Sequence, residues 1–442
     1  MTSLLAQIPS QAYTADEVAA PYIYVFYAAF LVAFCFTPVM QMIASYYGII
    51  DEPDNKRKLH STPVAYLGGV AVFLGWISGM AVSQFLSLHR TEAGLLPNLK
   101  VPFSIIVGAS VIVLLGLWDD VQRISPRVKI AGQMFAAVCL LLEGVGMNST
   151  RPLLVPVLGR AGTFFGLDMV NHPAFPYIVW ITSALLVIFA IVGCCNATNL
   201  MDGLDGLCGG VTAIIAAGFL FLAIHLAMYG GGMNSNWDAL RVVLGLALLG
   251  AVLGFIPYNF NPASIFMGDT GSMFLGYSCG TLIILLAQER PKWFLAAMVI
   301  FALPVLDTVL AFARRYVAGR PIFQADRFHF HHQLLGRGLT VRRAVVIIYA
   351  IAIGFALLGG AIVFVRTRYA VAIYLVIFGS LIVAAYKMGM VHERPRVARA
   401  GGIDEDEHVT PTEDIDPAGV LEIEDPRRRR PESKSGGAAP VA

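Results

Sequence analysis

Residues 175–193 read FPYIVWITSALLVIFAIVG and carry no charged side chain, whereas residues 194–206, which follow directly, read CCNATNLMDGLDG. An apolar run of this length predicts a helix that crosses the bilayer, because roughly 20 apolar residues span the hydrocarbon core. The amides and carboxylates behind it then lie in a link at one membrane surface. Such apolar runs and polar links alternate along most of the chain, and this alternation predicts the fold.

The composition is that of an integral membrane protein. Apolar residues make up 57% of the chain, charged residues 14%, and the mean hydropathy is +0.70, whereas soluble proteins carry about 25% charged residues. The runs are too long and too continuously apolar for the strands of a membrane barrel. We therefore predict an all-α polytopic membrane protein with about eleven transmembrane helices. They are expected near residues 22–47, 64–86, 102–118, 128–146, 175–193, 207–230, 239–258, 271–287, 293–313, 341–365 and 369–389.

Basic residues predict how the chain is oriented. Most of the 31 Lys and Arg residues fall in the links after odd-numbered runs and in the C-terminal tail, and positive charge favours the cytoplasmic side. We expect the N-terminus outside, the C-terminus in the cytoplasm and the protein in the cell (inner) membrane. The expected organisation is an external segment (1–21), a multi-span domain (22–389) and a disordered cytoplasmic tail (390–442) with too few apolar residues to fold.

Four links rich in carboxylates, amides or imidazoles fall on alternate gaps, so all four are expected at the cytoplasmic surface. They carry Asp119-Asp120, the segment from Asn196 to Asp205, Gly268-Asp269, and His329 to His332. An ionised Asp at a helix centre costs roughly 2.5–3.5 kcal/mol even on a lenient scale. These groups must therefore face water, a cation or one another, and we predict that the four links build one site.

The first two links offer oxygen ligands. Asp119 and Asp120 repel each other unless a cation or a proton lies between them, and a solvated helix end is the alternative interpretation. Asn199, Asp202 and Asp205 recur every three residues, which on a helix puts their oxygens along one face. Mg²⁺ prefers such ligands and shares its other positions with water and phosphate. Here a capped helix start is the alternative, and the interposed glycines allow close approach of a ligand or a break in the helix.

The third link surrounds a single carboxylate with small residues. Gly268 and Gly271 bracket Asp269, and glycines in this position let backbone N–H groups approach an anion at a helix start. Phe266 offers a flat face to a base. An ordinary Gly-Asp turn is the alternative interpretation.

The fourth link combines imidazoles with arginine. His329, His331 and His332 follow Arg327, a set that suits phosphate binding, while zinc and plain surface polarity remain alternatives. Zinc is disfavoured because the link has no Cys and lacks the usual His-x3-His spacing. Asp307 lies inside the apolar run 293–313 and is interpreted as structural support, paired with Arg314 or Arg315, while lining the cavity is the alternative.

Taken in order, these motifs resemble the polyprenyl-phosphate N-acetylhexosamine-1-phosphate transferase superfamily. The motifs are Asp119-Asp120 with Lys129, Asn196-x-x-Asn199-x-x-Asp202-Gly-x-Asp205-Gly, Phe266-Met-Gly-Asp269-x-Gly-Ser and His329-x-His331-His332. The resemblance covers roughly residues 20 to 390. It is strongest to the bacterial undecaprenyl-phosphate GlcNAc-1-phosphate transferases, because Phe330 interrupts the run of three histidines found in phospho-MurNAc-pentapeptide translocase.

The resemblance implies a role for each motif residue. Asp119 is expected to act as base, or in another proposal as nucleophile, with Asp120 beside it and Lys129 on phosphate. Asn199 and Asp269 are expected to hold Mg²⁺, with Mn²⁺ as a substitute. The expected substrate-binding residues are Asn196, Asp202, Asp205, Asn259, Phe266, Arg327, His329, His331 and His332, among which Asp205, Asn259 and Phe266 define the uracil site.

The implied reaction moves a sugar 1-phosphate, most directly GlcNAc 1-phosphate, from a UDP-sugar to undecaprenyl phosphate. Its products are a lipid-linked pyrophosphoryl sugar and UMP, as the first membrane step of cell-envelope polysaccharide or teichoic acid synthesis. The expected partners are the UDP-sugar, the polyprenyl phosphate and the membrane, without nucleic acid, and a homodimer is left open. A phospho-MurNAc-pentapeptide transferase and a cation-coupled transporter are the alternatives; the transporter is disfavoured because its polar residues belong near mid-membrane.

Overall fold

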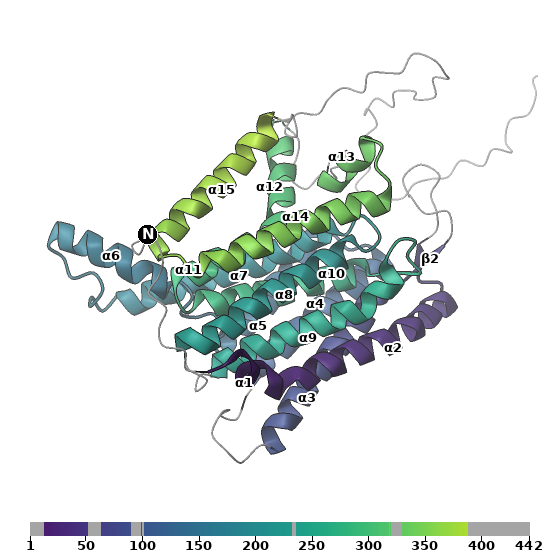
Figure 1. Ribbon diagram of the computed structural model, residues 1–442, viewed down its shortest axis with the longest axis horizontal. Coiled ribbons are helices and arrows are strands. Elements are labelled where there is room, and N and C mark those ends of the chain that lie inside the picture. The colour runs from purple at the N-terminus through teal and green to yellow at the C-terminus, as the bar shows by residue number, and fades with distance from the viewer. Residues whose placement is uncertain are drawn as a thin grey trace, which may run out of the picture. The chain divides into compact units, whose positions relative to one another are not determined.

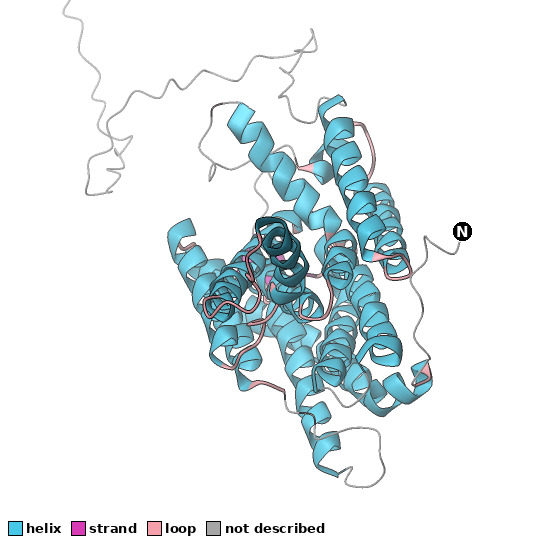
Figure 2. Ribbon diagram, turned by 90° about the vertical axis from the view of Figure 1, so that its left-hand side faces the viewer, coloured by secondary structure: helices cyan, strands magenta, loops and turns pink. Residues whose placement is uncertain are grey.

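The computed structural model describes residues 13–51, 63–89, 99, 101–231, 236–317, 319 and 329–387, and most of them are helical (Figure 1, Figure 2). Arg327 and the tail predicted for residues 390–442 lie outside the described residues. The helices are α1 (Ala15–Ala19), η1 (Ala20–Tyr22), α2 (Ile23–Tyr47), α3 (Gly68–His89), α4 (Phe103–Gln122), α5 (Pro126–Leu142), α6 (Arg151–Phe165), α7 (Phe175–Met201), α8 (Leu207–Leu226), η2 (Ala227–Gly231), α9 (Asn236–Asn259), α10 (Gly268–Ala287), α11 (Pro291–Ile300), α12 (Ala302–Val317), α13 (Phe330–Gly336), α14 (Val341–Ile362) and α15 (Thr367–Lys387).

Every predicted apolar run contains a helix, but the run predicted at 64–86 begins with a short strand, and α3 starts only at Gly68. Among the described residues, eight helices are long and apolar enough to cross a membrane, and the pair α11–α12 adds a ninth candidate if it is one bent span. The two other runs form α5, with 17 residues, and α15, whose apolar stretch is Thr367–Leu381. The prediction of an all-α polytopic membrane protein is confirmed. The count of eleven crossings and the sides of the two termini stay predictions.

The run predicted at 293–313 is broken rather than straight. Its two halves, α11 and α12, meet at an angle of 73°. Pro304 has no N–H to donate to the carbonyl group of Ile300, so α11 stops at Ile300 and the chain restarts as α12 at Ala302. In Figure 1 α12 stands nearly upright while α8, α9 and α14 run across the view.

Helix α10 is the buried centre of the helical bundle. Every residue of α10 except Asp269 is buried. Small residues permit this packing, because a Cβ on Gly271 would meet the backbone of Gly69 in α3, and a Cβ on Gly276 would meet the carbonyl oxygen of Cys194 in α7. The first turn of this rigid central helix therefore presents a single partly exposed carboxylate.

A small sheet lies beside the start of α10, and the sequence patterns did not predict it. Within the described residues its strands are β1 (Ile50–Asp51), β2 (Val64–Tyr66) and β3 (Ile265–Phe266). Strand β2 pairs antiparallel with β1 and parallel with β3, so that Tyr66 lies opposite Phe266. Strands of two or three residues are too short to show a period of two.

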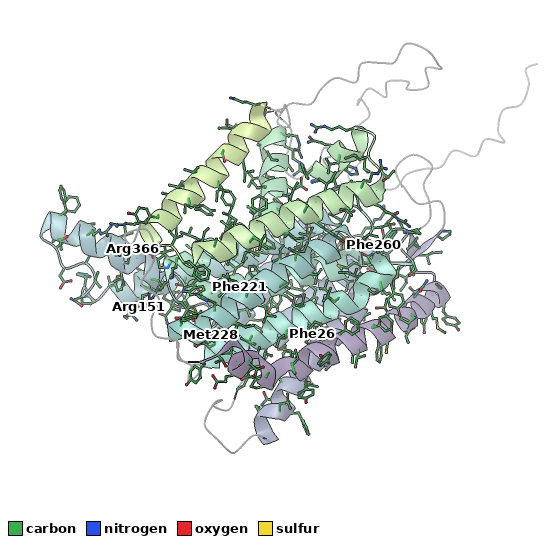
Figure 3. All side chains as sticks on the ribbon, in the orientation of Figure 1. Phe26, Arg151, Phe221, Met228, Phe260 and Arg366 are labelled. Atoms are coloured by element: carbon green, nitrogen blue, oxygen red, sulfur yellow. The ribbon has the colours of Figure 1, made fainter. Side chains whose placement is uncertain are left out.

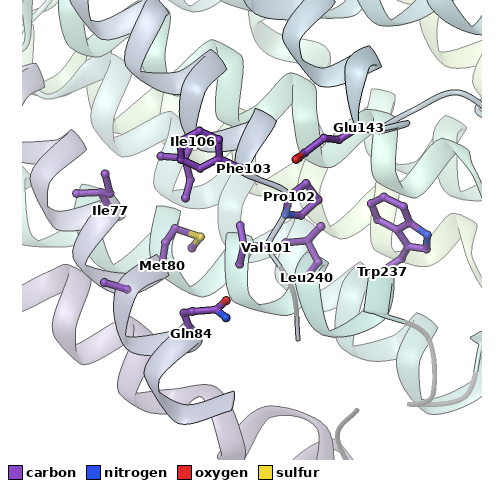
Figure 4. Close-up of a pocket in the computed structure, with 11 residues that line it drawn as sticks. Ile77, Met80, Gln84, Val101, Pro102, Phe103, Ile106, Glu143, Trp237 and Leu240 are labelled. Carbon is purple, nitrogen blue, oxygen red and sulfur yellow. The ribbon is translucent and has the colours of Figure 1, made fainter. Parts of the chain in front are cut away.

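The two ends of the bundle differ in chemistry. In Figure 3, Phe260 lies at the end where the polar links gather and Met228 at the opposite end. That opposite end holds a mostly apolar cavity of about 820 Å³ between α3, α4 and α9, with Met80, Phe103 and Trp237 in its wall and Glu143 beside it (Figure 4). The acidic and amide side chains of the site described next gather at the other end of the bundle.

Candidate active site

Lys129 joins two polar links that are far apart in the sequence. Its ammonium nitrogen (Nζ) lies 2.6 Å from Oδ2 of Asp269 and also pairs with the carboxylate of Asp119. Asp119 lies near the end of α4, Lys129 in the first turn of α5 and Asp269 in the first turn of α10. The side chain of Asp269 is 30% exposed, so this bridge is within reach of a ligand from water.

The turn from α4 to α5 fixes Asp119. Arg123 ends α4 with a left-handed backbone conformation (φ 49°), and Asp119 then accepts a hydrogen bond from the N–H of Ile124 at 2.8 Å through Oδ1. The other carboxylate oxygen, Oδ2, is the one that pairs with Lys129. The side chain thus has one oxygen anchored to its own turn and one directed at the site.

Asp120 points to a different partner, although it is next in the chain. It accepts hydrogen bonds from the N–H of Asp269 (2.8 Å), the N–H of Thr270 (3.1 Å) and the hydroxyl of Thr270 (2.6 Å). These are N–H groups that the first turn of a helix leaves without intrahelical partners, and a negative charge there also favours the helix dipole. The anion expected at the Gly268-Asp269 turn is therefore the carboxylate of Asp120 itself.

Amide side chains from α7 approach the same bridge. Asn199 donates from Nδ2 to Oδ1 of Asp269 (2.8 Å) and to the hydroxyl of Ser272 (3.0 Å). Asn196, one turn earlier on α7, donates to Oε1 of Gln133 (2.7 Å). Asn199 thus contacts the acidic cluster formed by Asp119 and Asp269 directly. Asn196 is linked to this cluster through Gln133 of α5.

Helix α7 ends before the row of Asn199, Asp202 and Asp205 is complete. Its last residue is Met201, and the chain turns at Gly203 and reverses at Gly206, which has a φ of +76° that suits glycine. The expectation that three oxygens lie along one helix face is thus wrong beyond Asn199, and the glycines produce the break instead. Removal from water, together with the negative charges of Asp269 and Asp120, raises the pKa of Asp202 to about 8.

Asp205 and Asn259 tie the start of α8 to the loop behind α9. Oδ2 of Asp205 accepts hydrogen bonds from Nδ2 of Asn261 (2.8 Å) and the N–H of Ala263 (3.1 Å). Buried Asn259 accepts from the N–H of Gly206 (3.1 Å) and donates to the carbonyl oxygen of Ile265 (3.0 Å). The side chains of Asp205 and Asn259 hold the loop that leads into β3. Their predicted role in a uracil site would therefore be to fix the backbone of this loop.

An aromatic pair borders this loop. The ring of Phe266 meets the ring of Tyr66 edge to face, with centroids 5.7 Å apart. Burial and the nearby carboxylates, first among them Asp51, raise the pKa of the Tyr66 hydroxyl above its usual value. Phe266 is half-buried.

The histidine link is attached to the broken span. Nδ1 of His329 lies 3.0 Å from Oδ2 of Asp307, and the N–H of Phe330 donates to Oδ1 of Asp307 at 2.9 Å. The rings of His329 and His331 are parallel, with centroids 5.7 Å apart, and the ring of His332 is 4.3 Å from that of His331. The interpretation of Asp307 as structural support fits these contacts.

The donors around Asp269 fit a hard divalent cation. In the described part of the chain, no group of three His, Cys, Asp or Glu side chains is arranged to hold a metal by itself. The available ligands are instead the carboxylate of Asp269, the amide of Asn199 and the carboxylate of Asp119, a set that suits Mg²⁺ shared with water and phosphate. The ammonium of Lys129 bridges Asp119 and Asp269 and supplies the positive charge between these two carboxylates.

Two residues that contact the site were not predicted from the sequence. Gln133 lies one turn after Lys129 on α5, and this i, i+4 spacing could have identified it. Its amide accepts from Asn196 and donates to the sulfur of Met273 at 3.3 Å. Tyr66 could not have been found in this way, because only the pairing of β2 with β3 brings it to the site.

Fold and site together define a polytopic helical membrane protein that gathers carboxylates, amides and a lysine at one end of its bundle, an arrangement suited to phosphate chemistry at a membrane surface. Residues 102–287 match the family model described as glycosyl transferase family 4. A Bacillus subtilis (strain 168) protein named probable undecaprenyl-phosphate N-acetylglucosaminyl 1-phosphate transferase is 34% identical over 344 residues, covering 77% of this chain and 85% of the relative. The chain belongs to glycosyl transferase family 4.

Other relatives are similar over comparable lengths. A protein of Mycobacterium tuberculosis (strain H37Rv) named decaprenyl-phosphate N-acetylglucosaminephosphotransferase is 34% identical over 377 residues, which cover 81% of this chain and 85% of that protein. A Bacillus cereus (strain AH187) phospho-N-acetylmuramoyl-pentapeptide-transferase is 28% identical over 333 residues, covering 73% of this chain and 91% of the relative.

Proposed function

We propose that this protein transfers N-acetylglucosamine 1-phosphate from UDP-N-acetylglucosamine to a polyprenyl phosphate, such as undecaprenyl phosphate, in the cell membrane. The names of the relatives that are 34% identical support the sugar and the lipid. The single structural observation that supports it best is the bridge from Asp119 through Lys129 to Asp269. The bridge brings Asp119, Lys129 and Asp269, to which we assign the roles of base, phosphate-binding cation and metal ligand, to the same end of α4, α5 and α10.

The chemistry needs one nucleophilic attack. An oxygen of the lipid phosphate attacks the phosphorus that carries the sugar, and the bond from that phosphorus to the oxygen bridging to UMP breaks. One phosphoanhydride is lost and another is formed, so the step is nearly isoenergetic and independent of ATP. A phosphate oxygen is already a competent nucleophile, which favours direct attack over an intermediate on Asp119.

Each residue of the site has a separate role in this transfer step. Asp119 takes a proton from the lipid phosphate, and Lys129 holds the phosphates in line and balances their charge. Asp120 fixes the first turn of α10 and so the place of Asp269. Asn199 and Asp269 would hold Mg²⁺, which supplies charge neutralisation as UMP departs.

Orientation in the membrane follows from the same proposal. UDP-sugars are cytosolic, and the basic residues near the site, among them Lys129, favour the cytoplasmic side. The active site then faces the cytoplasm at the inner leaflet. Labelling of single-cysteine variants at Asp119 and Asp269 in closed vesicles tests this, because reagent reaching both from the extracytoplasmic side would reverse the orientation.

Transfer of phospho-MurNAc-pentapeptide is the second candidate. The relative with that name is 28% identical, against 34% for the GlcNAc relatives, and Phe330 separates His329 from His331 here. A panel of donors tests the choice with purified protein, Mg²⁺ and undecaprenyl phosphate. UMP release with UDP-GlcNAc and not with UDP-MurNAc-pentapeptide supports the proposal, the reverse result selects the second candidate, and substrate flux without UMP release selects a transporter.

A further inference from the structure

We propose that Asp307 is a positioning residue: it holds the ring of His329, and through the stacked rings of His329 and His331 it places Nε2 of His331 beside Gly203 to contact the nucleotide-sugar donor. This inference rests on the proposed function, and it adds a residue of the broken span to the donor-binding machinery. Asp307 itself does not touch the acidic cluster in the structure. It acts through the two imidazoles.

Asp307 uses both carboxylate oxygens on the histidine link. Oδ2 lies 3.0 Å from Nδ1 of His329 and Oδ1 accepts the N–H of Phe330 at 2.9 Å. Asp307 and His329 are both buried, with exposed fractions of 6% each. A carboxylate that accepts from Nδ1 leaves the proton on that nitrogen and directs Nε2 away from it, which fixes both the tautomer and the ring. The short helix α13 is thereby attached to α12 at its first residue.

The orientation of His329 passes to His331 by ring packing. His329 precedes α13 as its N-cap residue, and its ring is parallel to that of His331 within 4°, with centroids 5.7 Å apart. His331 is 2% exposed, yet its Nε2 has no hydrogen-bond partner among the residues that the structure describes. Leaving a buried polar atom without a partner is unfavourable, so this nitrogen is expected to meet a group of a bound ligand.

Gly203 shows where His331 points. A Cβ built on Gly203 would collide with Nε2 and Cε1 of the His331 ring, so only glycine permits this approach. Gly203 follows Asp202, and it lies in the turn between the metal-binding end of α7 and the start of α8. Burial, with the neighbouring His332, lowers the pKa of His331 to about 3, so its imidazole is neutral, with one N–H to donate and one lone pair. A neutral imidazole suits a sugar hydroxyl, an amide or a phosphate oxygen of the donor.

Asp307→Asn is the sharpest test. The amide oxygen still accepts the N–H of Phe330, while the charge that orients His329 is lost. We expect the KM for UDP-GlcNAc to rise about tenfold, which is the loss of one hydrogen bond to a charged group. The KM for undecaprenyl phosphate should stay unchanged and kcat should fall less than threefold. Asp307→Glu, which keeps the charge, should recover part of the donor KM.

Two controls separate positioning from folding. Thr308→Val changes the next residue of α12, whose hydroxyl bonds to Pro304 within the same helix (2.9 Å), and it should leave both KM values unchanged. In the double variant Asp307→Asn with His331→Ala, the effects on donor KM should not add, because both act through one imidazole.

Three results would overturn the inference. One is a normal donor KM in folded Asp307→Asn. Another is an equal loss toward both substrates together with a lower melting temperature. The third is simple additivity with His331→Ala. A wild-type protein that releases no UMP would instead reject the proposed function, and this inference would fall with it.

Discussion

Asp120 accepts two hydrogen bonds from one residue, Thr270, at 3.1 Å from the backbone N–H and 2.6 Å from the hydroxyl. These residues are 150 positions apart in the chain, and they join the end of α4 to the first turn of α10. Of the two adjacent carboxylates, Asp119 therefore faces the site and Asp120 faces the protein. The two carboxylates therefore have different partners and different roles, which their adjacency in the sequence does not indicate.

Asp120→Ala should reduce stability as well as activity. It leaves the N–H groups of Asp269 and Thr270 without their acceptor, and the loss of a helix cap costs about 0.5–2 kcal/mol. Asp119→Ala should abolish UMP release with a much smaller change in melting temperature, because only one backbone N–H, that of Ile124, loses its acceptor. Thermal unfolding in detergent and a UMP assay compare the two variants. Equal melting temperatures would mean that Asp120 does not secure α10.

Lys129→Ala should lower UMP release by at least about 100-fold, the scale found when one charge-stabilising group is removed from an active site. Asp119 and Asp269 are then left without the ammonium group that bridges them. Lys129→Arg should recover only part of the rate, because a guanidinium group is larger and planar. A rate within threefold of wild type in Lys129→Ala would reduce the residue to a determinant of topology.

Chelation by EDTA should stop UMP release, and added Mg²⁺ should restore it. Mg²⁺ at about 100 times its dissociation constant should also stabilise the folded protein by about 2.7 kcal/mol. Asp269→Asn should abolish both effects. Asp168→Asn is the matched control, because Asp168 is an exposed carboxylate that accepts hydrogen bonds from its near neighbour Asn171. A normal Mg²⁺-dependent thermal shift in Asp269→Asn would remove Asp269 from the metal site.

The sequence predicted the helices and the grouping of the links better than the contacts within the group. Hydrophobic length located every apolar run, and the alternation of the links placed Asp119 and Asp269 together. The partner of Asp120 was not predictable, since it depends on how α4 packs against α10. The break at Phe301 was not predictable either, because the sequence alone does not say which proline a helix tolerates. The contact of Gly203 with His331 joins two segments whose approach no local pattern encodes.

Gly276→Ala should destabilise the protein by about 1–3 kcal/mol, the usual cost of overpacking a core. A Cβ there would meet Cys194 and Thr198 of α7, and α10 would have to shift. Gly354→Ala in α14 is the control, because nothing lies within 4 Å of the added carbon, and alanine favours a helix over glycine by about 1 kcal/mol. Melting temperatures in detergent should move in opposite directions. A neutral Gly276→Ala would show that α10 adjusts easily.

Arg241→Ala should be strongly destabilising although it lies far from the site. Arg241 is fully buried near the end of α10 opposite Asp269, and donates to the carbonyl oxygen of Leu285 from Nε (3.1 Å) and Nη2 (2.9 Å). Its guanidinium group also pairs with Asp238 (2.6 Å) and Glu289 (2.7 Å). Removing one partner of a buried ion pair typically costs about 3–5 kcal/mol, because the remaining charge is left without compensation.

Replacing the acids as well separates uncompensated charge from lost packing. The triple variant Arg241→Ala, Asp238→Asn, Glu289→Gln should regain part of the melting temperature lost by Arg241→Ala, since it buries no unpaired carboxylate. UMP release per folded molecule should stay near the wild-type value in both, because Asp120 and Lys129 still hold the other end of α10. A tenfold loss in the folded fraction would show instead that Arg241 sets the axial position of α10, and with it the place of Asp269.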